Sequence, residues 1–225
     1  MEIDRIILQI FNGSDSLFLD RFVVTLTHGL SWVPMYIVLA ILIIKNNKTM
    51  SQILLIFGCG IVGVLLSGVL SDLIIKPIVM RPRPFNDPEW SEMVKTVSGY
   101  HASGYSFFSS HAANTFSLAL FFSLLVRSKL LSFTLISWSL FNAWTRLYLG
   151  VHWFTDVMTG LTWGAIVAFA MYSLYRYVFY HISPKVKYVS SKYTSTGYAY
   201  TDIYACVCIV VFTFLFGIFR AVIVI

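Results

Sequence analysis

Long apolar runs, separated by short polar segments, recur along the whole chain and constrain its fold more than any other feature. They cover residues 22–44, 53–75, 108–126, 130–143, 154–177 and 203–219. A helix needs about 20 residues to cross the hydrocarbon core of a bilayer, and most of the runs approach this length. Because 58% of the residues are hydrophobic and only 12% are charged, the chain is solvated by lipid rather than by water. The sequence therefore predicts an all-α, polytopic membrane protein with six transmembrane helices.

The segments outside these runs predict how the ends of the spans are connected. Apolar residues at positions 3, 6, 7, 10 and 11 repeat with helical spacing, which indicates an interfacial helix within residues 1–20. Residues 76–107 form a long, proline-containing loop, and residues 181–225 comprise a basic loop and the last span. Pro34 is expected to kink the first span. We expect one membrane-embedded domain over residues 1–225.

The distribution of charge predicts the orientation of the chain. The net charge is +6, but the basic residues lie in short loops and not along one face, so nucleic acid is not an expected partner. On one side of six alternating spans, the connections at 45–48, 127–129 and 176–192 contain eight Lys or Arg and no acidic residue. The positive-inside rule makes that side cytoplasmic. We therefore expect the polar clusters to face outward. The compact size and the outward site favour a bacterial inner-membrane protein, in which the clusters would face the periplasm.

One polar cluster lies at the start of the 76–107 loop, and a second follows directly after its end. The first contains Lys76 and Arg83. Arginine presents a planar fork of donors that suits phosphate oxygens, and lysine adds a point charge, although contact with lipid head groups is an alternative. The second cluster is Ser109-Ser110-His111, at the start of the third span. The amides at a helix N-terminus favour an anion there, although serine is also a common helix cap.

A third cluster lies between the fourth and fifth runs and contains Arg146, His152 and Asp156. His152 and Asp156 are four residues apart, so a helix would bring the carboxylate within reach of the imidazole. A carboxylate at one ring nitrogen fixes the tautomer and stabilises the charged form, which would make His152 a nucleophile. A metal site is the alternative, but the neighbouring cations would repel a divalent ion. We expect neither a metal nor a cofactor.

In chain order, the clusters read Lys-x6-Arg-Pro, Ser-Ser-His and Thr-Arg-x5-His-x3-Asp. This resembles the phosphatidic acid phosphatase type 2 superfamily, whose members carry Lys-x6-Arg-Pro, Pro-Ser-Gly-His and Ser-Arg-x5-His-x3-Asp in the same order. The sequence departs from that pattern at Phe108, which replaces Pro, at Ser110, which replaces Gly, and at Thr145, which replaces Ser. The motifs span residues 76–156, and the six-span layout extends the resemblance over most of the chain.

The resemblance implies a metal-independent hydrolase of a lipid phosphate ester or diphosphate. His152 would attack phosphorus to form a phosphohistidine, Asp156 would orient it, and His111 would protonate the leaving oxygen and later activate water. The residues implied to hold the phosphoryl oxygens are Lys76, Arg83, Ser109, Ser110 and Arg146. Arg81 lies outside the pattern and is a candidate substrate contact.

An outward-facing site that is fed by apolar helices favours an amphipathic substrate. Undecaprenyl diphosphate, phosphatidylglycerol phosphate, phosphatidic acid and a lipid A phosphate all fit this description. Residues 85–104 are expected to select among them, and a solvated lid without substrate contacts is the alternative. One alternative is a lipid phosphotransferase that uses the same histidine with another acceptor. A further alternative is a non-catalytic lipid-binding or transport protein, in which the charged residues mark a head-group path.

Overall fold

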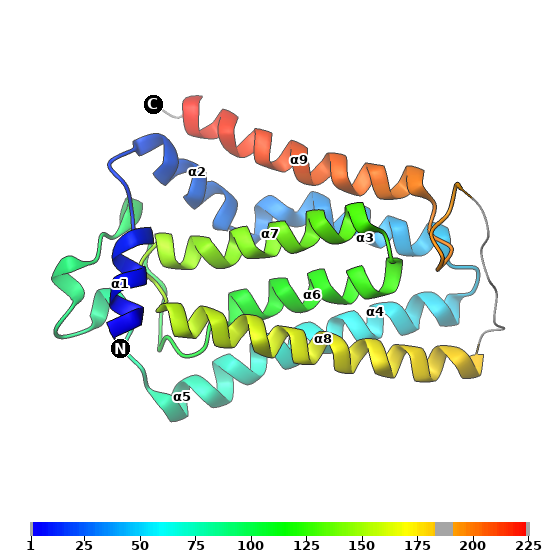
Figure 1. Ribbon diagram of the computed structural model, residues 1–225, viewed down its shortest axis with the longest axis horizontal. Coiled ribbons are helices and arrows are strands. Elements are labelled where there is room, and N and C mark those ends of the chain that lie inside the picture. The colour runs from blue at the N-terminus through cyan, green and yellow to red at the C-terminus, as the bar shows by residue number, and fades with distance from the viewer. Residues whose placement is uncertain (1, 183–190, 224–225) are drawn as a thin grey trace.

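The computed structural model describes residues 2–182 and 191–223, and this part of the chain is helical with no strand. An isolated β-bridge joins Tyr193 and Ala199. The helices are α1 (Glu2–Phe11), α2 (Leu17–Thr27), α3 (Val33–Asn46), α4 (Met50–Val64), α5 (Lys76–Val79), α6 (Ser110–Val126), α7 (Lys129–Tyr148), α8 (Phe154–Ile182) and α9 (Tyr200–Ile223). Most of them run along the long axis of the molecule (Figure 1). The predicted all-α class is confirmed.

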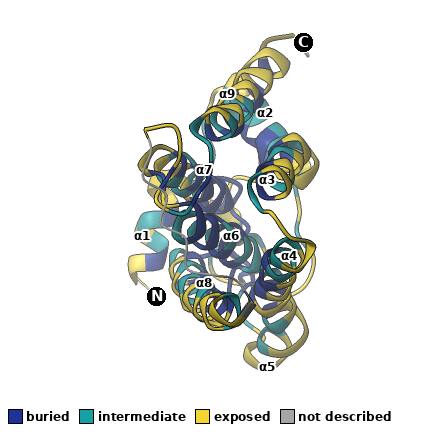
Figure 2. Cartoon of the chain, turned by 90° about the vertical axis from the view of Figure 1, so that its right-hand side faces the viewer, coloured by how far each residue is buried: buried dark blue, intermediate teal, exposed yellow. Residues whose placement is uncertain are grey.

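Within the described part of the chain, four helical segments are long and apolar enough to cross a membrane, namely Gly29–Asn46, Met50–Asn86, Phe154–His181 and Tyr200–Ile223. Helix α6 has only 17 residues, and α7 carries several polar side chains. These two helices differ in position from the four long apolar segments, because α6 and α7 lie at the centre of the bundle and bury many of their residues (Figure 2). Helix α7 still leaves Phe133 and Leu140 exposed on one face. The number of six spans is not confirmed by length and composition alone.

Three predicted boundaries need correction. The first apolar run is not one kinked span, because α2 ends at Thr27 and a 3₁₀ turn, Gly29–Trp32, precedes α3. Pro34 stands in the first turn of α3, where its missing N–H costs nothing, so it starts a helix instead of bending one. The interfacial segment 1–20 divides into α1 and the start of α2. The loop expected from residue 76 begins only after α5, where Met80 adopts a left-handed conformation.

The second span is one long helical path in which π-helical turns replace the regular pattern. Helix α4 continues through Leu65–Val69 and Ser71–Ile75 into α5, which carries Lys76. The hydroxyl of Ser71, buried in this path, donates to the backbone oxygen of Phe108 at 2.8 Å. This contact fixes the end of the second span against the segment that leads into α6.

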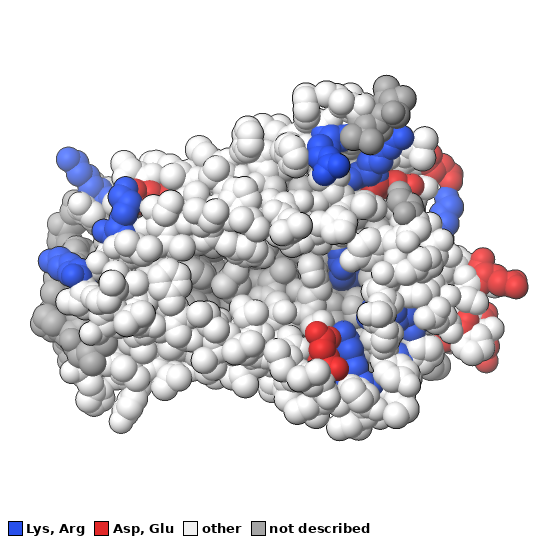
Figure 3. Space-filling model, turned by 180° about the vertical axis from the view of Figure 1, so that it is seen from behind, with Lys and Arg blue, Asp and Glu red and all other residues white. Residues whose placement is uncertain are grey.

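Polar segments gather at one end of the bundle, as the alternation of spans predicts. Helix α1, the loop after α5 and the connection between α7 and α8 lie together at the left of Figure 1, whereas the α3–α4 and α6–α7 turns lie at the right. In Figure 3 the charged side chains are likewise concentrated at the two ends, and a nearly uncharged belt separates them. Large apolar side chains such as Leu54 and Phe212 are more than half exposed on the outward faces of the helices, as expected for contact with lipid.

Two glycines allow α8 to approach α6 closely. A Cβ atom at Gly160 would lie 2.5 Å from the backbone oxygen of Ser109, and one at Gly164 would lie 2.5 Å from that of Ala113. Small residues four apart are the usual means by which membrane helices reach such short separations. This contact sets the start of α6 against the first turns of α8, and both segments contribute to the polar end of the bundle.

Gly164→Ala is expected to destabilise the protein by about 1–3 kcal/mol, because the added methyl group meets the α6 backbone. Gly58→Ala is the matched control, since a Cβ at Gly58 has no heavy atom within 4 Å and alanine improves helix propensity. The measurement is the midpoint of thermal unfolding in detergent. Equal midpoints for Gly164→Ala and the wild type would show that the close approach is not required.

Candidate active site

The turn between α7 and α8 determines where His152 and Asp156 lie. Helix α7 ends at Tyr148, and Gly150 takes a positive φ of 66°, with Val94 at 2.6 Å from the position of an added Cβ. Helix α8 begins only at Phe154, so His152 belongs to the turn and not to the helix. The Asp156 carboxylate accepts a hydrogen bond from the backbone N–H of Trp153 at 2.9 Å, which closes the turn.

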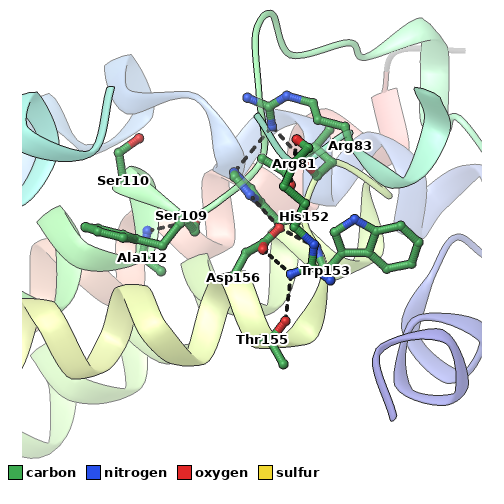
Figure 4. A network of polar contacts seen from close by, with 12 residues as sticks. Arg81, Arg83, Ser109, Ser110, Ala112, His152, Trp153, Thr155 and Asp156 are labelled. Atoms are coloured by element: carbon green, nitrogen blue, oxygen red, sulfur yellow. Dashed lines mark hydrogen bonds and ion pairs between the residues drawn. The ribbon is translucent and has the colours of Figure 1, made fainter. Parts of the chain in front are cut away.

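His152 and Asp156 lie next to each other even though a single helix does not carry both. Nδ1 of His152 is 3.6 Å from Oδ2 of Asp156, and both side chains are buried. Nε2 of His152 is 3.4 Å from Nη1 of Arg83 (Figure 4). A guanidinium group can only donate, so Nε2 carries the lone pair and the ring proton is on Nδ1, facing the carboxylate. This is the tautomer that a nucleophilic imidazole requires.

The environment of His152 favours the neutral imidazole. Burial lowers its pKa from the ordinary value of 6.5 to about 4, because the charged form loses its hydration. Asp156 acts in the opposite direction and raises the pKa, whereas the positive charges of Arg83 and Lys76 lower it further. At neutral pH the ring is therefore uncharged and its Nε2 lone pair is available.

Arg83 holds the loop after α5 against the α7–α8 turn. Its side chain is buried and donates to the backbone oxygens of Ser103, Gly104 and Val151 at 2.8 to 3.0 Å. The contact with His152 Nε2 uses a fourth donor of the five that a guanidinium offers. The sequence predicted Arg83 as a phosphate ligand; the structure places it beside the histidine, and most of its donors organise the surrounding backbone.

The two serines of the predicted site, Ser109 and Ser110, lie on the α6 side of the His152–Asp156 pair (Figure 4). The Ser109 hydroxyl accepts from the backbone N–H of Ala112 and caps α6, as the alternative interpretation of this residue proposed. The backbone N–H of Ser109 donates to the backbone oxygen of Asp156 at 3.0 Å. The Ser110 hydroxyl accepts from Lys76 Nζ at 3.4 Å. Lys76 Nζ also forms an ion pair with Asp72 at 2.6 Å.

Arg146 and His111 have partners that the sequence analysis did not identify. Nη1 of Arg146 donates to the hydroxyl of Tyr100 at 3.3 Å, and the guanidinium lies over the Tyr100 ring at 5.7 Å. Nε2 of His111 is 3.4 Å from Oδ1 of Asn142. Tyr100 was expected only as part of the loop that selects the substrate, and Asn142 lies within a predicted span. No sequence pattern near either residue therefore indicated its contact with Arg146 or His111. The charge of Arg146 acts on His111, so these two groups share one electrostatic environment.

Arg81 has protein partners in this structure. It donates to Asp156 at 2.6 Å and to Asp4 of α1 at 2.7 Å, although the sequence suggested it as a contact for substrate. The sequence predicted no role for Asp4. No pattern within either segment could have paired residues that are 77 positions apart.

The described residues contain no group of three or more His, Cys, Asp or Glu side chains that could hold a metal ion. The site brings together a neutral imidazole, a carboxylate behind it and several cations around it. Such a set can bind an anion and attack it with nitrogen. Fold and site together are those of a membrane-embedded protein that can hold an anionic group beside a nucleophilic imidazole.

Comparison with known proteins gives the family. The model of the PAP2 superfamily matches residues 52–180. The chain therefore belongs to the PAP2 superfamily, as its motifs indicated, and it is an integral membrane lipid phosphatase.

Three curated bacterial relatives match the chain over most of its length. It is 34% identical to the lipid A 4'-phosphatase of Porphyromonas gingivalis, over 79% of this chain and 75% of the relative. It is also 34% identical to the lipid A 4'-phosphatase of Bacteroides thetaiotaomicron, over 76% of each chain. The undecaprenyl-diphosphatase BcrC of Bacillus subtilis is 27% identical, over 68% of this chain and 74% of the relative. No solved structure matches the chain.

The lowered pKa of His152 predicts that its ring stays neutral from pH 8 down to about pH 5. A histidine with the ordinary pKa would be mostly protonated well before that point. The measurement is a pH titration of ¹³C-labelled histidine by NMR in detergent, with the signal assigned by its loss in His152→Asn. A midpoint near 6.5 would contradict the burial argument.

Proposed function

We propose that this protein removes the 4'-phosphate of lipid A through a phosphohistidine on His152. The observation that carries the catalytic part is the buried His152–Asp156 pair, in which the unprotonated Nε2 of His152 faces the Arg83 guanidinium at 3.4 Å. The choice of lipid A is supported by the two relatives of that name, which share 34% identity with this chain, against 27% for the undecaprenyl-diphosphatase.

The first step of the proposed reaction is attack of His152 Nε2 on phosphorus. A bond forms between nitrogen and phosphorus, the ester bond between phosphorus and the sugar oxygen breaks, and His111 gives that oxygen a proton. Asp156 stabilises the positive charge that develops on the imidazole. In the second step, His111 removes a proton from water, and the resulting hydroxide displaces His152 from phosphorus to release inorganic phosphate.

The cations and hydroxyls around the pair account for the binding of the phosphoryl group. Lys76, Arg83 and Arg146 bring three positive charges to this end of the bundle, which stabilise the negative charge on the phosphoryl oxygens in the transition state. Ser109 and Ser110 add a hydroxyl or a backbone amide at the start of α6. In this proposal the protein cations supply the charge stabilisation, and no metal ion takes part.

A lipid substrate fits the position of the site at the end of an apolar belt. Figure 3 shows that this belt is hollowed on one face, next to the charged end of the molecule. Acyl chains in the belt and a phosphate at the charged end would satisfy both parts of an amphipathic molecule. The basic connections at the opposite end support a cytoplasmic location for that end, so we place the protein in the bacterial inner membrane with its site facing the periplasm.

The wild-type protein in detergent with a chelator is expected to release phosphate from a bisphosphorylated lipid A and to leave the 1-phosphate in place. His152→Ala is expected to lose at least about 10⁴-fold of this activity, because the nucleophile is removed. The measurement combines phosphate release with mass spectrometry of the lipid product, and undecaprenyl diphosphate and phosphatidic acid serve as comparison substrates. Undiminished activity in His152→Ala would refute the mechanism. Transfer of phosphate to an added alcohol would instead identify a phosphotransferase.

The proposed orientation predicts which residues can be labelled from outside the cell. Glu92→Cys and Lys48→Cys are introduced separately into a variant without the native Cys59, Cys206 and Cys208; both positions are exposed, and they lie at opposite ends of the bundle. A maleimide that passes the outer membrane but not the inner membrane should label Glu92→Cys in intact cells. The same reagent should label Lys48→Cys only after the cells are lysed. The reverse pattern would invert the topology.

A further inference from the structure

We propose that Arg81 and Asp4 are a positioning pair that fixes the Asp156 carboxylate and, through it, the orientation of His152. The kinetic consequences of this inference rest on the proposed function. The inference itself rests on a chain of short contacts that leads from α1 to the active site, and none of these contacts belongs to the phosphate-binding groups.

Arg81 bridges two buried carboxylates. Nη1 donates to Oδ1 of Asp156 at 2.6 Å and to the Thr155 hydroxyl at 2.7 Å, and Nη2 donates to Oδ2 of Asp4 at 2.7 Å. The side chain of Asp156 is 0% exposed and that of Asp4 is 4% exposed. The guanidinium also lies 5.3 Å from the centre of the Trp153 ring. Removal of one partner from such a set leaves an uncompensated buried charge, so the three groups depend on each other.

The two oxygens of Asp156 have separate partners. Oδ1 accepts from Arg81, whereas Oδ2 accepts from the backbone N–H of Trp153 and lies 3.6 Å from Nδ1 of His152 (Figure 4). Arg81 therefore prevents the carboxylate from rotating Oδ2 away from the imidazole. Because Nδ1 of His152 has no hydrogen bond within the described part of the chain, the position of Oδ2 determines whether that contact can tighten when phosphate binds.

Asp4 extends this support to another helix. Its Oδ1 accepts from the backbone N–H of Thr155 at 2.8 Å, and its Oδ2 accepts from the Thr155 hydroxyl at 2.9 Å. Asp4 of α1 thus accepts from the Thr155 amide, which has no acceptor inside the first turn of α8, while Asp156 accepts from the amide of Trp153. Negative groups at a helix N-terminus are stabilised by its dipole. Helix α1 therefore contributes directly to the geometry of the first turn of α8.

A second ion pair on the same helix supplies a matched control. Arg5 pairs with Glu89 at 2.7 Å and lies 4.9 Å from the centre of the Trp90 ring. This pair also attaches α1 to the loop after α5, but the contacts described for it do not include Asp156 or His152. Loss of a general attachment of α1 can therefore be separated from loss of the contact with Asp156.

The test compares Arg81→Gln, Arg81→Lys, Asp4→Asn and Arg5→Gln by the kcat and KM of phosphate release. Arg81→Gln is expected to lower kcat about a hundredfold and to leave KM within about threefold, because the catalytic groups lose their alignment while substrate binding persists. Asp4→Asn should lower kcat by about tenfold and add little to Arg81→Gln, since both act on one set of contacts. Arg81→Lys should recover part of the loss, and Arg5→Gln should behave as the wild type.

A measurement that does not need hydrolysis completes the test. The ¹⁵N shifts of labelled histidine report which ring nitrogen carries the proton, and Arg81→Gln is expected to change the tautomer ratio of His152, whereas Arg5→Gln is not. Thermal unfolding identifies a variant that fails to fold, in which case Arg81→Lys and Asp4→Asn supply the comparison.

Three results would overturn the inference. The first is a raised KM with unchanged kcat in Arg81→Gln, which would make Arg81 a substrate contact. The second is an equal loss of kcat in Arg5→Gln, which would reduce the role of α1 to general attachment. The third is wild-type kcat and an unchanged His152 tautomer in Arg81→Gln. Absence of phosphate release by the wild type with every lipid tested would instead refute the proposed function, and the tautomer measurement would still decide the role of Arg81.

Discussion

The burial of one carboxylate, that of Asp156, is the constraint on which the polar end of this molecule depends. A charge without access to water must find partners in the protein, or the fold loses several kcal/mol. Asp156 takes its three partners from two segments: the α7–α8 turn supplies the Trp153 amide and the His152 imidazole, and the loop after α5 supplies the Arg81 guanidinium. Segments that are distant in sequence must converge on this group, and the convergence assembles the site.

The charge balance around His152 explains how the same region can be stable and still bind an anion. Arg81 is matched by two carboxylates, whereas Arg83 mainly contacts backbone oxygens and Arg146 contacts the hydroxyl of Tyr100. The charges of Arg83 and Arg146 therefore have no carboxylate among these hydrogen-bond partners, and a phosphate would compensate them. The proposed substrate thus completes an electrostatic arrangement that the protein alone leaves positive.

The sequence alone was sufficient to predict the helical class and the end of the bundle at which the polar clusters meet, because local patterns encode both. Hydropathy predicted the helical class, and the alternation of spans predicted that His152, Arg83 and the start of α6 share one end of the bundle. The break before α3 was missed because a proline can either bend a helix or begin one, and tertiary contacts decide between these outcomes. The partners of Arg81, Arg146 and His111 were missed for another reason: they lie on other elements, and only the packing of those elements brings them together.

The close contact between α6 and α8 at Gly160 and Gly164 has a consequence for how this scaffold can diversify. The separation of the two helices is set by backbone atoms, which have no rotamers to adjust, and the helices carry His111 and Asp156 at their first turns. The spacing between the proposed acid and the group behind the nucleophile is thus insulated from mutations elsewhere. Loops and peripheral helices can then change to accept a different lipid while the chemistry stays the same.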